Sequence, residues 1–323
     1  MLYVSTRNKV DAFTTYRALR SETAPDGGYF MPMQLPILTD VQLAQLEQMN
    51  FGQATAFAMN LLFGTQITGW DVDFAVGRQA VVFNEIGPKV FVSENWHNPA
   101  GEFAYFVRRL YALVHGEKFP NEKPNAWFLT AAYIAVLFGA YGQLCRRDVY
   151  EFDIAVQTLD LQQMLAIRCA QKMGLPIMKI ILGSLDGDGL WEFFSYGDFA
   201  TARDVLPTGL DSLLWLQFGV HEVQKFLTIS QKRGIYKLKL TDLDVLKQSV
   251  FVAVVGNSRA KDVAHGAIRS VGYAMEAGTA RAFGALQDYR AKHGESRNTL
   301  LLADIMPGDL KSKNISGYTQ QKE

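Results

Sequence analysis

Short runs of apolar residues, almost without polar alternation, constrain the fold of this 323-residue chain most strongly. The run Phe152–Val156 leads into a helical segment that ends near Gly174, and a second run, Ile177–Leu182, follows at once. Strands that are apolar on both faces must be covered on both faces, and strands joined through a helix run parallel. Together with the apolar runs Val250–Val255 and Thr299–Ala303, this pattern predicts an α/β fold: a mainly parallel sheet with helices on both faces.

One segment, Trp127–Leu144, contains no charged residue and is long enough to raise the question of a membrane span. Gly139 and Gly142 suit close packing between helices, and no second span of this kind accompanies it. Apolar residues make up 49% of the chain and charged residues 20%, which is typical of globular proteins. We therefore expect a helix buried in the protein core and no membrane partner. A further segment, Leu213–Leu227, is expected to be helical.

The charges balance, with 32 Lys and Arg against 32 Asp and Glu. A neutral chain gives no basis for expecting nucleic acid or an anionic membrane surface as a partner. Cys145 and Cys169 both lie in apolar helical patterns, which favours buried thiols in a reducing compartment over a disulfide. The first ten residues lack the apolar core of a signal peptide, so we expect a cytoplasmic protein.

The N-terminal segment combines a short strand at Tyr3–Arg7 with a turn at Pro25-Asp26-Gly27-Gly28. Proline fixes φ, aspartate can bond its own backbone and glycine accepts positive φ, which together make a tight turn. The sequence Y-V-S-T-R followed by A-P-D-G-G-Y-x-x-P resembles the N-terminal signature of the threonine synthases.

A second resemblance lies in the stretch Phe91–Tyr111, which reads as a strand end, a loop at His97-Asn98-Pro99 and an amphipathic helix. It is similar to the threonine synthase active-site segment E-L-F-H-G-P-T-x-A-F-K-D-F and keeps Glu94, His97 and the two phenylalanines. In that family the lysine forms a Schiff base with pyridoxal phosphate (PLP). The matching position here is Ala104.

The resemblance extends over almost the whole chain but departs from the family where PLP would bind. The family's phosphate loop, G-N-F-G, corresponds to Leu159-Asp160-Leu161-Gln162, which has lost both glycines. Its D-P-H-T-A segment corresponds to Glu276–Ala280 and keeps only Thr279-Ala280. The resemblance thus implies the large-domain fold of threonine synthase (tryptophan synthase β-like), and the departures from it imply that no cofactor is bound. His115, His221, His265 and His293 are dispersed without the spacing of metal ligands, so we expect no metal site.

The expected division of the chain is a threonine-synthase-like N-terminal region at 1–85, an α/β core at 86–310 and a polar tail at 311–323. The family's PLP-covering small domain carries an S-G-D-T-G motif that is absent here, and the connection His115–Pro124 is too short to hold a domain.

These observations define a vestigial cleft without assigned catalytic residues. We first interpret the chain as a non-enzymatic homologue that binds a small metabolite or a protein partner. We expect Leu159 and Leu161 to fill part of the former cofactor cleft. A second copy of the chain is the simplest partner to cover the rest of it. Two alternatives remain: lysine-independent chemistry with His97 and Glu94 or Glu102 as acid and base, and residual threonine-synthase-type carbon–oxygen lyase activity. The nearby aromatic residues Trp96, Phe103, Tyr105 and Phe106 either belong to the core or line a pocket. The cleft comprises His97, Asn98, Ala104, Thr158, Leu159, Asp160, Gln162 and Thr279.

Overall fold

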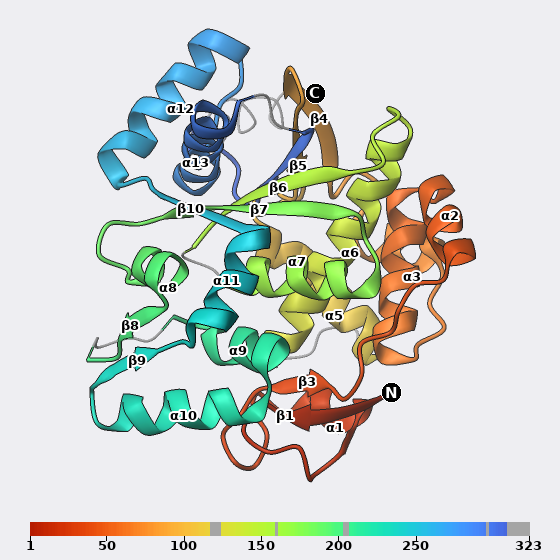
Figure 1. Ribbon diagram of the computed structural model, residues 1–323. Coiled ribbons are helices and arrows are strands. Elements are labelled where there is room, and N and C mark those ends of the chain that lie inside the picture. Colours follow the sequence, from red (N-terminus) through yellow and green to blue (C-terminus); the bar gives the residue numbers. More distant parts are fainter. Residues whose placement is uncertain (117–123, 159–160, 203–206, 295–296, 309–323) are drawn as a thin grey trace.

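The computed structural model describes residues 1–116, 124–158, 161–202, 207–294 and 297–308 (Figure 1). Its central sheet has the strand order β10-β7-β6-β11-β5-β4. Neighbouring strands from β10 to β5 are parallel, and β4 joins the edge antiparallel to β5. The mainly parallel sheet predicted from the sequence is therefore confirmed. The strands are β4 (Val82–Gly87), β5 (Val90–Glu94), β6 (Phe152–Gln157), β7 (Ile177–Ser184), β10 (Val250–Val254) and β11 (Thr299–Ala303).

Helices cover both faces of this sheet, as predicted. On one face lie α12 (Asn257–Val271) and α13 (Ala277–His293), and on the other α5 (Phe103–His115), α6 (Ala126–Cys145) and α7 (Leu161–Met173) (Figure 1). Strand side chains alternate between two hydrophobic clusters because successive residues point to opposite faces. Ala155 packs in the cluster under α12 and α13, whereas Ile154 packs in the larger cluster with α5, α6 and α7.

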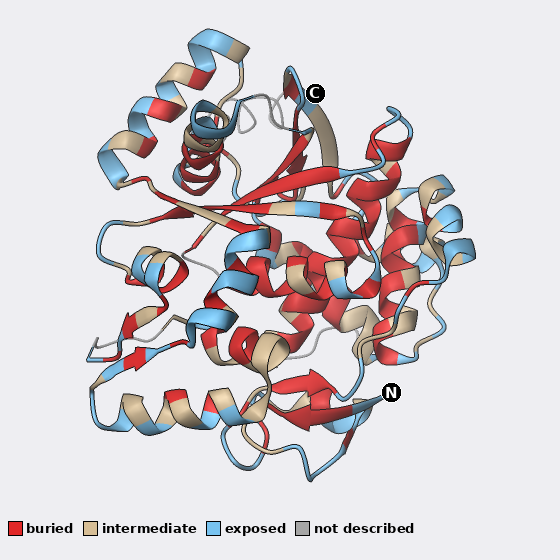
Figure 2. Ribbon diagram, viewed as in Figure 1, coloured by how far each residue is buried: buried red, intermediate tan, exposed pale blue. Residues whose placement is uncertain are grey.

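The uncharged helix α6 lies in the interior of the protein (Figure 2). The Asn125 side chain caps its start by accepting from the Phe128 N–H at 2.9 Å. The helix packs mainly against α7 and α3 (Phe51–Phe63). It is long and apolar enough to span a bilayer, but 89% of its most apolar window is buried within the protein. Its side chains thus belong to the core, as the sequence analysis expected.

The N-terminal region is a three-stranded antiparallel sheet followed by helices. The expected turn forms: Asp26 Oδ1 accepts from the Gly28 N–H at 3.0 Å and from the Ser5 hydroxyl at 2.7 Å. The strands pair in the order β2-β1-β3. This region shares the larger core, and β4 crosses the expected boundary at residue 85. Its elements are β1 (Leu2–Ser5), β2 (Phe13–Thr14), α1 (Thr15–Arg20), β3 (Phe30–Pro32), α2 (Asp40–Gln48), α3 and α4 (Gly69–Val76).

The segment between β7 and β10 differs from expectation in one respect. Where the sequence predicts one helical stretch, the structure has α9 (Leu210–Phe218) and α10 (Val220–Gln231). Gly219 separates them with φ 87°, a conformation that residues with a Cβ rarely adopt. The remaining elements here are α8 (Leu190–Tyr196), β8 (Asp198–Ala200), β9 (Ile235–Lys237) and α11 (Leu240–Ser249).

Candidate functional site

The carboxyl ends of the parallel strands meet at one edge of the sheet, where ligands bind in open α/β folds. The loops after β5, β6, β7, β10 and β11 lie at this edge, together with the start of α13. Most described residues of the expected cleft are in these loops. Each is considered below with the partners that the fold gives it.

His97 lies in the loop after β5, beside the last residue of that strand. Its Nε2 is 2.5 Å from Glu94 Oε2, and the Tyr273 hydroxyl donates to Glu94 Oε1 at 2.7 Å. Burial alone would raise the pKa of Glu94, but the hydrogen bonds from His97 and Tyr273 hold that pKa below its usual value. The Glu94 side chain is buried while 31% of the His97 side chain is exposed. A buried carboxylate thus orients an accessible imidazole whose Nδ1 makes no hydrogen bond to the described residues.

Asn98 closes the same loop rather than facing a ligand. Its Oδ1 accepts from the backbone N–H groups of Ala100 and Glu102 at 3.1 and 3.4 Å, and its Nδ2 donates to the Glu102 carbonyl at 2.9 Å. The exposed Glu102 forms a backbone bridge with Ile305. Of the two acidic residues considered as partners for His97, the structure therefore pairs it with Glu94.

Ala104 lies in the first turn of α5 and is exposed. The preceding residue, Phe103, fixes the start of the helix: its N–H donates to the Asp304 carbonyl at 2.7 Å, and its ring lies 4.4 Å from that of Tyr133. Tyr105, which follows, is half-buried. The position that the resemblance gives to the Schiff-base lysine thus carries only a methyl group at the surface.

The aromatic residues around this loop are mostly core residues. Trp96, Phe103 and Phe106 are each at most 5% exposed. The Trp96 indole also stacks on the His97 imidazole, with ring centroids 4.1 Å apart. Their side chains stabilise the loop and the start of α5.

Asp304, which follows β11, organises the centre of the edge. Its Oδ1 accepts from Asn95 Nδ2 at 2.8 Å, and its Oδ2 accepts from the Tyr133 hydroxyl at 2.5 Å and from Gln163 Nε2 at 2.6 Å. The Ser93 hydroxyl in turn donates to Asn95 Oδ1 at 2.8 Å. Sequence analysis missed this network. The available signal was an acidic residue directly after an apolar parallel strand.

Thr158 follows β6 and belongs to a second carboxylate network. Its hydroxyl donates to Asp188 Oδ2 at 2.6 Å, and the Ser184 hydroxyl donates to Asp188 Oδ1 at 2.8 Å. The backbone N–H groups of Leu185 and Leu190 complete the set at 3.0 and 2.8 Å. The glycine-rich loop after β7 therefore wraps around its own aspartate.

Gln162 lies in the first turn of α7 and is 2% exposed. Its Oε1 accepts from the Thr130 hydroxyl of α6 at 2.6 Å, which joins the two helices. Leu161 is buried in the larger core cluster. The remaining cleft residues, Leu159 and Asp160, lie outside the described residues.

Thr279 lies in the first turn of α13, next to a fourth carboxylate, that of Glu276. Glu276 caps this helix: its Oε1 accepts from the Thr279 N–H at 2.6 Å and from the Thr279 hydroxyl at 2.9 Å. Arg281, two residues further along the helix and 2% exposed, donates to Val255 O, Gln157 Oε1 and Asn257 Oδ1. Burial lowers the pKa of Arg281, and the negative charges of Glu276 and Asp188 oppose that change.

The edge as a whole is rich in acceptors whose donors come from the chain itself. Four carboxylates lie here, those of Glu94, Asp188, Glu276 and Asp304, and each accepts at least two hydrogen bonds. Arg281 contributes a buried positive charge. No group of three or more His, Cys, Asp or Glu residues among the described positions is arranged to hold a metal ion. The arrangement suits donors and cations better than it suits an anion.

Comparisons with known proteins agree with this architecture. Residues 2–77 match the family model described as the threonine synthase N terminus. No curated protein matches the chain.

Three solved structures share the fold over nearly the whole chain. A PLP-bound threonine synthase from Brucella melitensis aligns with a TM-score of 0.79 and 16% identity, covering 97% of this chain and 90% of that one. Yeast threonine synthase gives a TM-score of 0.77 at 15% identity, with 98% and 90% covered. The Escherichia coli enzyme gives 0.70 at 14% identity, with 98% and 91% covered. Residues 2–77 thus resemble the threonine synthase N terminus, and the chain as a whole has the fold of the threonine synthase structures.

Proposed function

We propose that this protein is a threonine-synthase-like homologue that has lost PLP-dependent catalysis and acts by binding a ligand or a partner. The observation that carries the proposal is Ala104, exposed on α5 at the position that the resemblance gives to the Schiff-base lysine. An imine to the protein requires an amine, and an alanine side chain cannot supply one. Among the described residues at this edge of the sheet, α5 and residues 95–102, 158, 185–189, 272–276 and 304–308 contain no lysine.

The residues at the edge also do not fit the phosphate of PLP. A phosphate is held by converging N–H and O–H donors, often at a helix N-terminus. At the start of α13 those donors already bind Glu276, and in the loop after β7 they bind Asp188. A dianion placed here would compete with these carboxylates and be repelled by them, at a cost of several kcal/mol at intermediate dielectric. We therefore derive no reaction step through PLP.

PLP titration tests the proposal. The purified protein is titrated with PLP, scanned for the absorbance of an internal aldimine and treated with borohydride before peptide mapping. We expect no saturable band and no lysine trapped at a single position, whereas a threonine synthase treated in the same way gives both. A saturable band trapped at one lysine in the wild-type chain would refute the proposal, and with it would revive threonine-synthase-type lyase activity.

The variant Ala104→Lys separates the two reasons for the loss. If the missing amine were the only defect, this variant would gain a trapped lysine at position 104. We expect at most slow, non-saturable reaction, because the phosphate donors remain occupied by Asp188 and Glu276. Circular dichroism of both proteins controls for folding.

A second candidate function, acid–base chemistry without lysine, is favoured by one observation. His97 is accessible and is held 2.5 Å from a buried Glu94, an arrangement that suits proton transfer at the other ring nitrogen. His97→Gln keeps a hydrogen-bond donor toward Glu94 but cannot carry a proton. If a metabolite found to bind here is also converted, and conversion but not binding is lost in His97→Gln, the enzymatic interpretation replaces ours.

We further propose a cytoplasmic protein, because Cys145 and Cys169 are both free and buried. The partner that we favour first is a second copy of this chain.

A further inference from the structure

Among the described residues, His97 is the histidine whose ring is held by a buried carboxylate. Its Nε2 lies 2.5 Å from Glu94 Oε2, and Glu94 is 5% exposed. A carboxylate only accepts hydrogen bonds, so the ring proton lies on Nε2 and the lone pair of the neutral ring lies on Nδ1. Nδ1 makes no hydrogen bond to the described residues and is not one of their buried unpartnered atoms, so it reaches solvent.

Two further contacts prepare this ring to carry a positive charge. The Tyr273 hydroxyl donates to Glu94 Oε1 at 2.7 Å. Burial acts to raise the pKa of Glu94, but the hydrogen bonds from His97 and Tyr273 hold that pKa below its usual value, so the side chain is ionised at neutral pH. The Trp96 indole stacks on the imidazole, with ring centroids 4.1 Å apart. A carboxylate and an electron-rich indole face both stabilise positive charge on the imidazole.

The other histidines lack this combination. Both ring nitrogens of His115 are buried. His221, His265 and His293 are exposed, but none of them pairs with a carboxylate of the described residues. His97 alone among the described histidines thus has an accessible Nδ1 opposite a charged, buried partner at Nε2.

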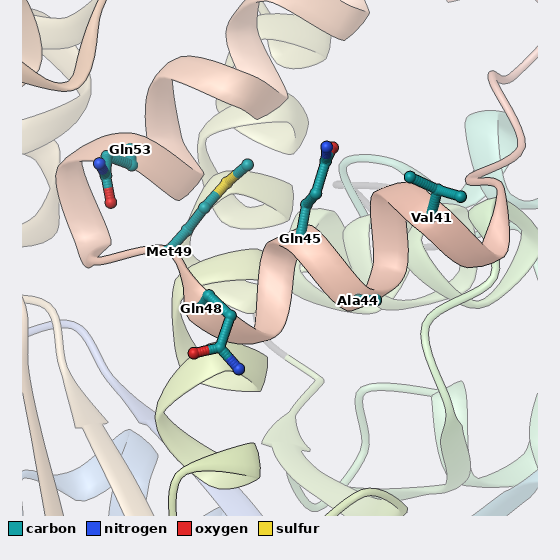
Figure 3. Close-up of a pocket in the computed structure, with 6 residues that line it drawn as sticks. All are labelled: Val41, Ala44, Gln45, Gln48, Met49 and Gln53. Carbon is teal, nitrogen blue, oxygen red and sulfur yellow. The ribbon is translucent and has the colours of Figure 1, made fainter.

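The groove along α2 and the start of α3 offers no group of this kind (Figure 3). It has a volume of about 730 Å³ and is open to solvent. Aliphatic, thioether and amide side chains line it, and none of these titrates near neutral pH. The groove therefore has room for a ligand but no base. The lining residues are Val41, Ala44, Gln45, Gln48, Met49 and Gln53.

We propose that His97 Nδ1 is a nucleophile that accepts an acyl group from an uncharged activated ester. The Nδ1 lone pair forms a bond to the carbonyl carbon, and the bond from that carbon to the leaving oxygen breaks. Positive charge develops on the ring during the attack, next to the Glu94 carboxylate. Nε2 then releases its proton through Glu94 to solvent, and the leaving oxygen takes up a proton. The products are a neutral acylated imidazole and an alcohol or phenol.

The charges around His97 favour an uncharged donor over an anionic one. The exposed Glu102 lies in the same loop, and three further carboxylates lie along the same edge of the sheet. The described residues 95–102 and 304–308 contain neither Lys nor Arg. An acyl phosphate would bring negative charge towards these carboxylates, whereas an uncharged ester meets no such repulsion.

Peptide mapping after limited treatment with diethyl pyrocarbonate, an uncharged acylating reagent, tests the nucleophile. Rates at the individual histidines of the intact protein are compared on the plateau at high pH, where imidazole rings are neutral. We expect His97 to react at least about 10-fold faster than the more exposed His265, which has no carboxylate to stabilise the developing charge. Because His265 belongs to the same molecule, it is an internal reference for the state of the fold.

Variants of the carboxylate test its role. Glu94→Gln keeps an acceptor oxygen for Nε2 but removes the charge, so we expect His97 to react no faster than His265. Tyr273→Phe removes only the second hydrogen bond to Glu94 and should give a smaller decrease. The matched control is Glu85→Gln, which replaces an exposed glutamate of the same hairpin and should leave the rate at His97 unchanged. Circular dichroism checks that each variant is folded.

The reagents 4-nitrophenyl acetate and acetyl phosphate test the charge of the donor. Each rate at His97 is divided by the rate of free N-acetylhistidine with the same reagent. We expect a ratio of at least about 10 for the uncharged ester and a ratio below one for the anionic acyl phosphate. A wild-type His97 that reacts no faster than His265, a rate that neither Glu94→Gln nor Tyr273→Phe lowers, or a larger ratio for acetyl phosphate would overturn the inference. Acylation of His97 needs neither PLP nor a lysine, so it can fail while the proposed function stands.

Discussion

Acidic side chains at the two ends of the central sheet differ in their hydrogen-bond partners and in their burial. At the carboxyl end, Asp188 and Asp304 accept several hydrogen bonds each and hold loops together. At the amino end, Asp153 of β6 is fully buried, and neither of its oxygens accepts a hydrogen bond of good geometry from the described residues. Burial raises the pKa of Asp153, and the charges of Arg297 and Lys179 only partly oppose this. We therefore expect a carboxylate to stabilise this fold only where the chain supplies its hydrogen-bond donors.

The largest expected effect is the loss of a satisfied carboxylate. Asp304→Ala leaves the Tyr133 hydroxyl and the Asn95 and Gln163 amides without their acceptor, so the free energy of unfolding should fall by about 3 kcal/mol. Urea denaturation monitored by circular dichroism measures it. The control Asp304→Asn keeps one acceptor oxygen and should lose clearly less. If both variants lose the same free energy of unfolding, the hydrogen bonds to the Asp304 side-chain oxygens do not account for its effect on stability.

An effect of opposite sign is expected at the other end of the sheet. Asp153→Asn removes a fully buried charge that accepts no hydrogen bond of good geometry from the described residues, so it should raise the free energy of unfolding at pH 7 by about 1 kcal/mol. The pKa of Asp153 is raised in the folded state, so the protonated side chain stabilises the wild-type fold at low pH. This contribution to the free energy of unfolding is lost as the pH rises through the folded-state pKa of Asp153. The gain should therefore shrink on acidification. If Asp153→Asn is less stable than the wild type at neutral pH, the Asp153 carboxylate stabilises the fold, and the proposed difference between the two ends of the sheet is wrong.

The smallest effect concerns Glu94, whose folded-state pKa is lowered by His97 and Tyr273 despite its burial. A carboxylate whose pKa is lowered on folding stabilises the fold when the pH is above its pKa in the unfolded state. This stabilisation is lost as the pH falls through its pKa in the folded state. The variant Glu94→Gln should therefore show a flatter acid limb when unfolding free energy is plotted against pH. The control Glu85→Gln replaces an exposed glutamate of the same hairpin and should keep the wild-type slope. If the free energy of unfolding falls equally steeply with acid in the wild type and in both variants, the ionisation of Glu94 does not contribute to the stability of the fold.

The sequence predicted the central sheet and the buried helix α6 well, because each of these elements has its own local pattern of apolar residues. The four apolar runs became β6, β7, β10 and β11 of one sheet, and Trp127–Leu144 became the buried α6. The single helical stretch expected around Gly219 is divided, since one positive-φ glycine in an apolar segment leaves little trace in the hydrophobic pattern.

The contacts of the candidate site were harder to predict. The sequence grouped His97, Thr158 and Thr279 in one cleft, but it did not indicate the carboxylates Asp188 and Glu276 that bind the two threonines, nor the Asp304 network. Asn95 and Asp304 are 209 residues apart in the chain, and Tyr133 and Asp304 are 171 apart. No periodicity or spacing rule joins residues at such separations. Contacts of this kind emerge only when the strands are assembled.

The position of β11 has a consequence for biosynthesis. It is the last strand in the described chain, yet it lies in the middle of the sheet between β6 and β5. During translation the earlier strands emerge with a gap that only residues 299–303 can fill, and the Asp304 network closes directly afterwards. The sheet edges next to that gap stay open until residues 299–303 have been made, and long-range pairing of this kind is slow. We therefore expect the nascent chain to depend most on chaperones in the interval before β11 emerges.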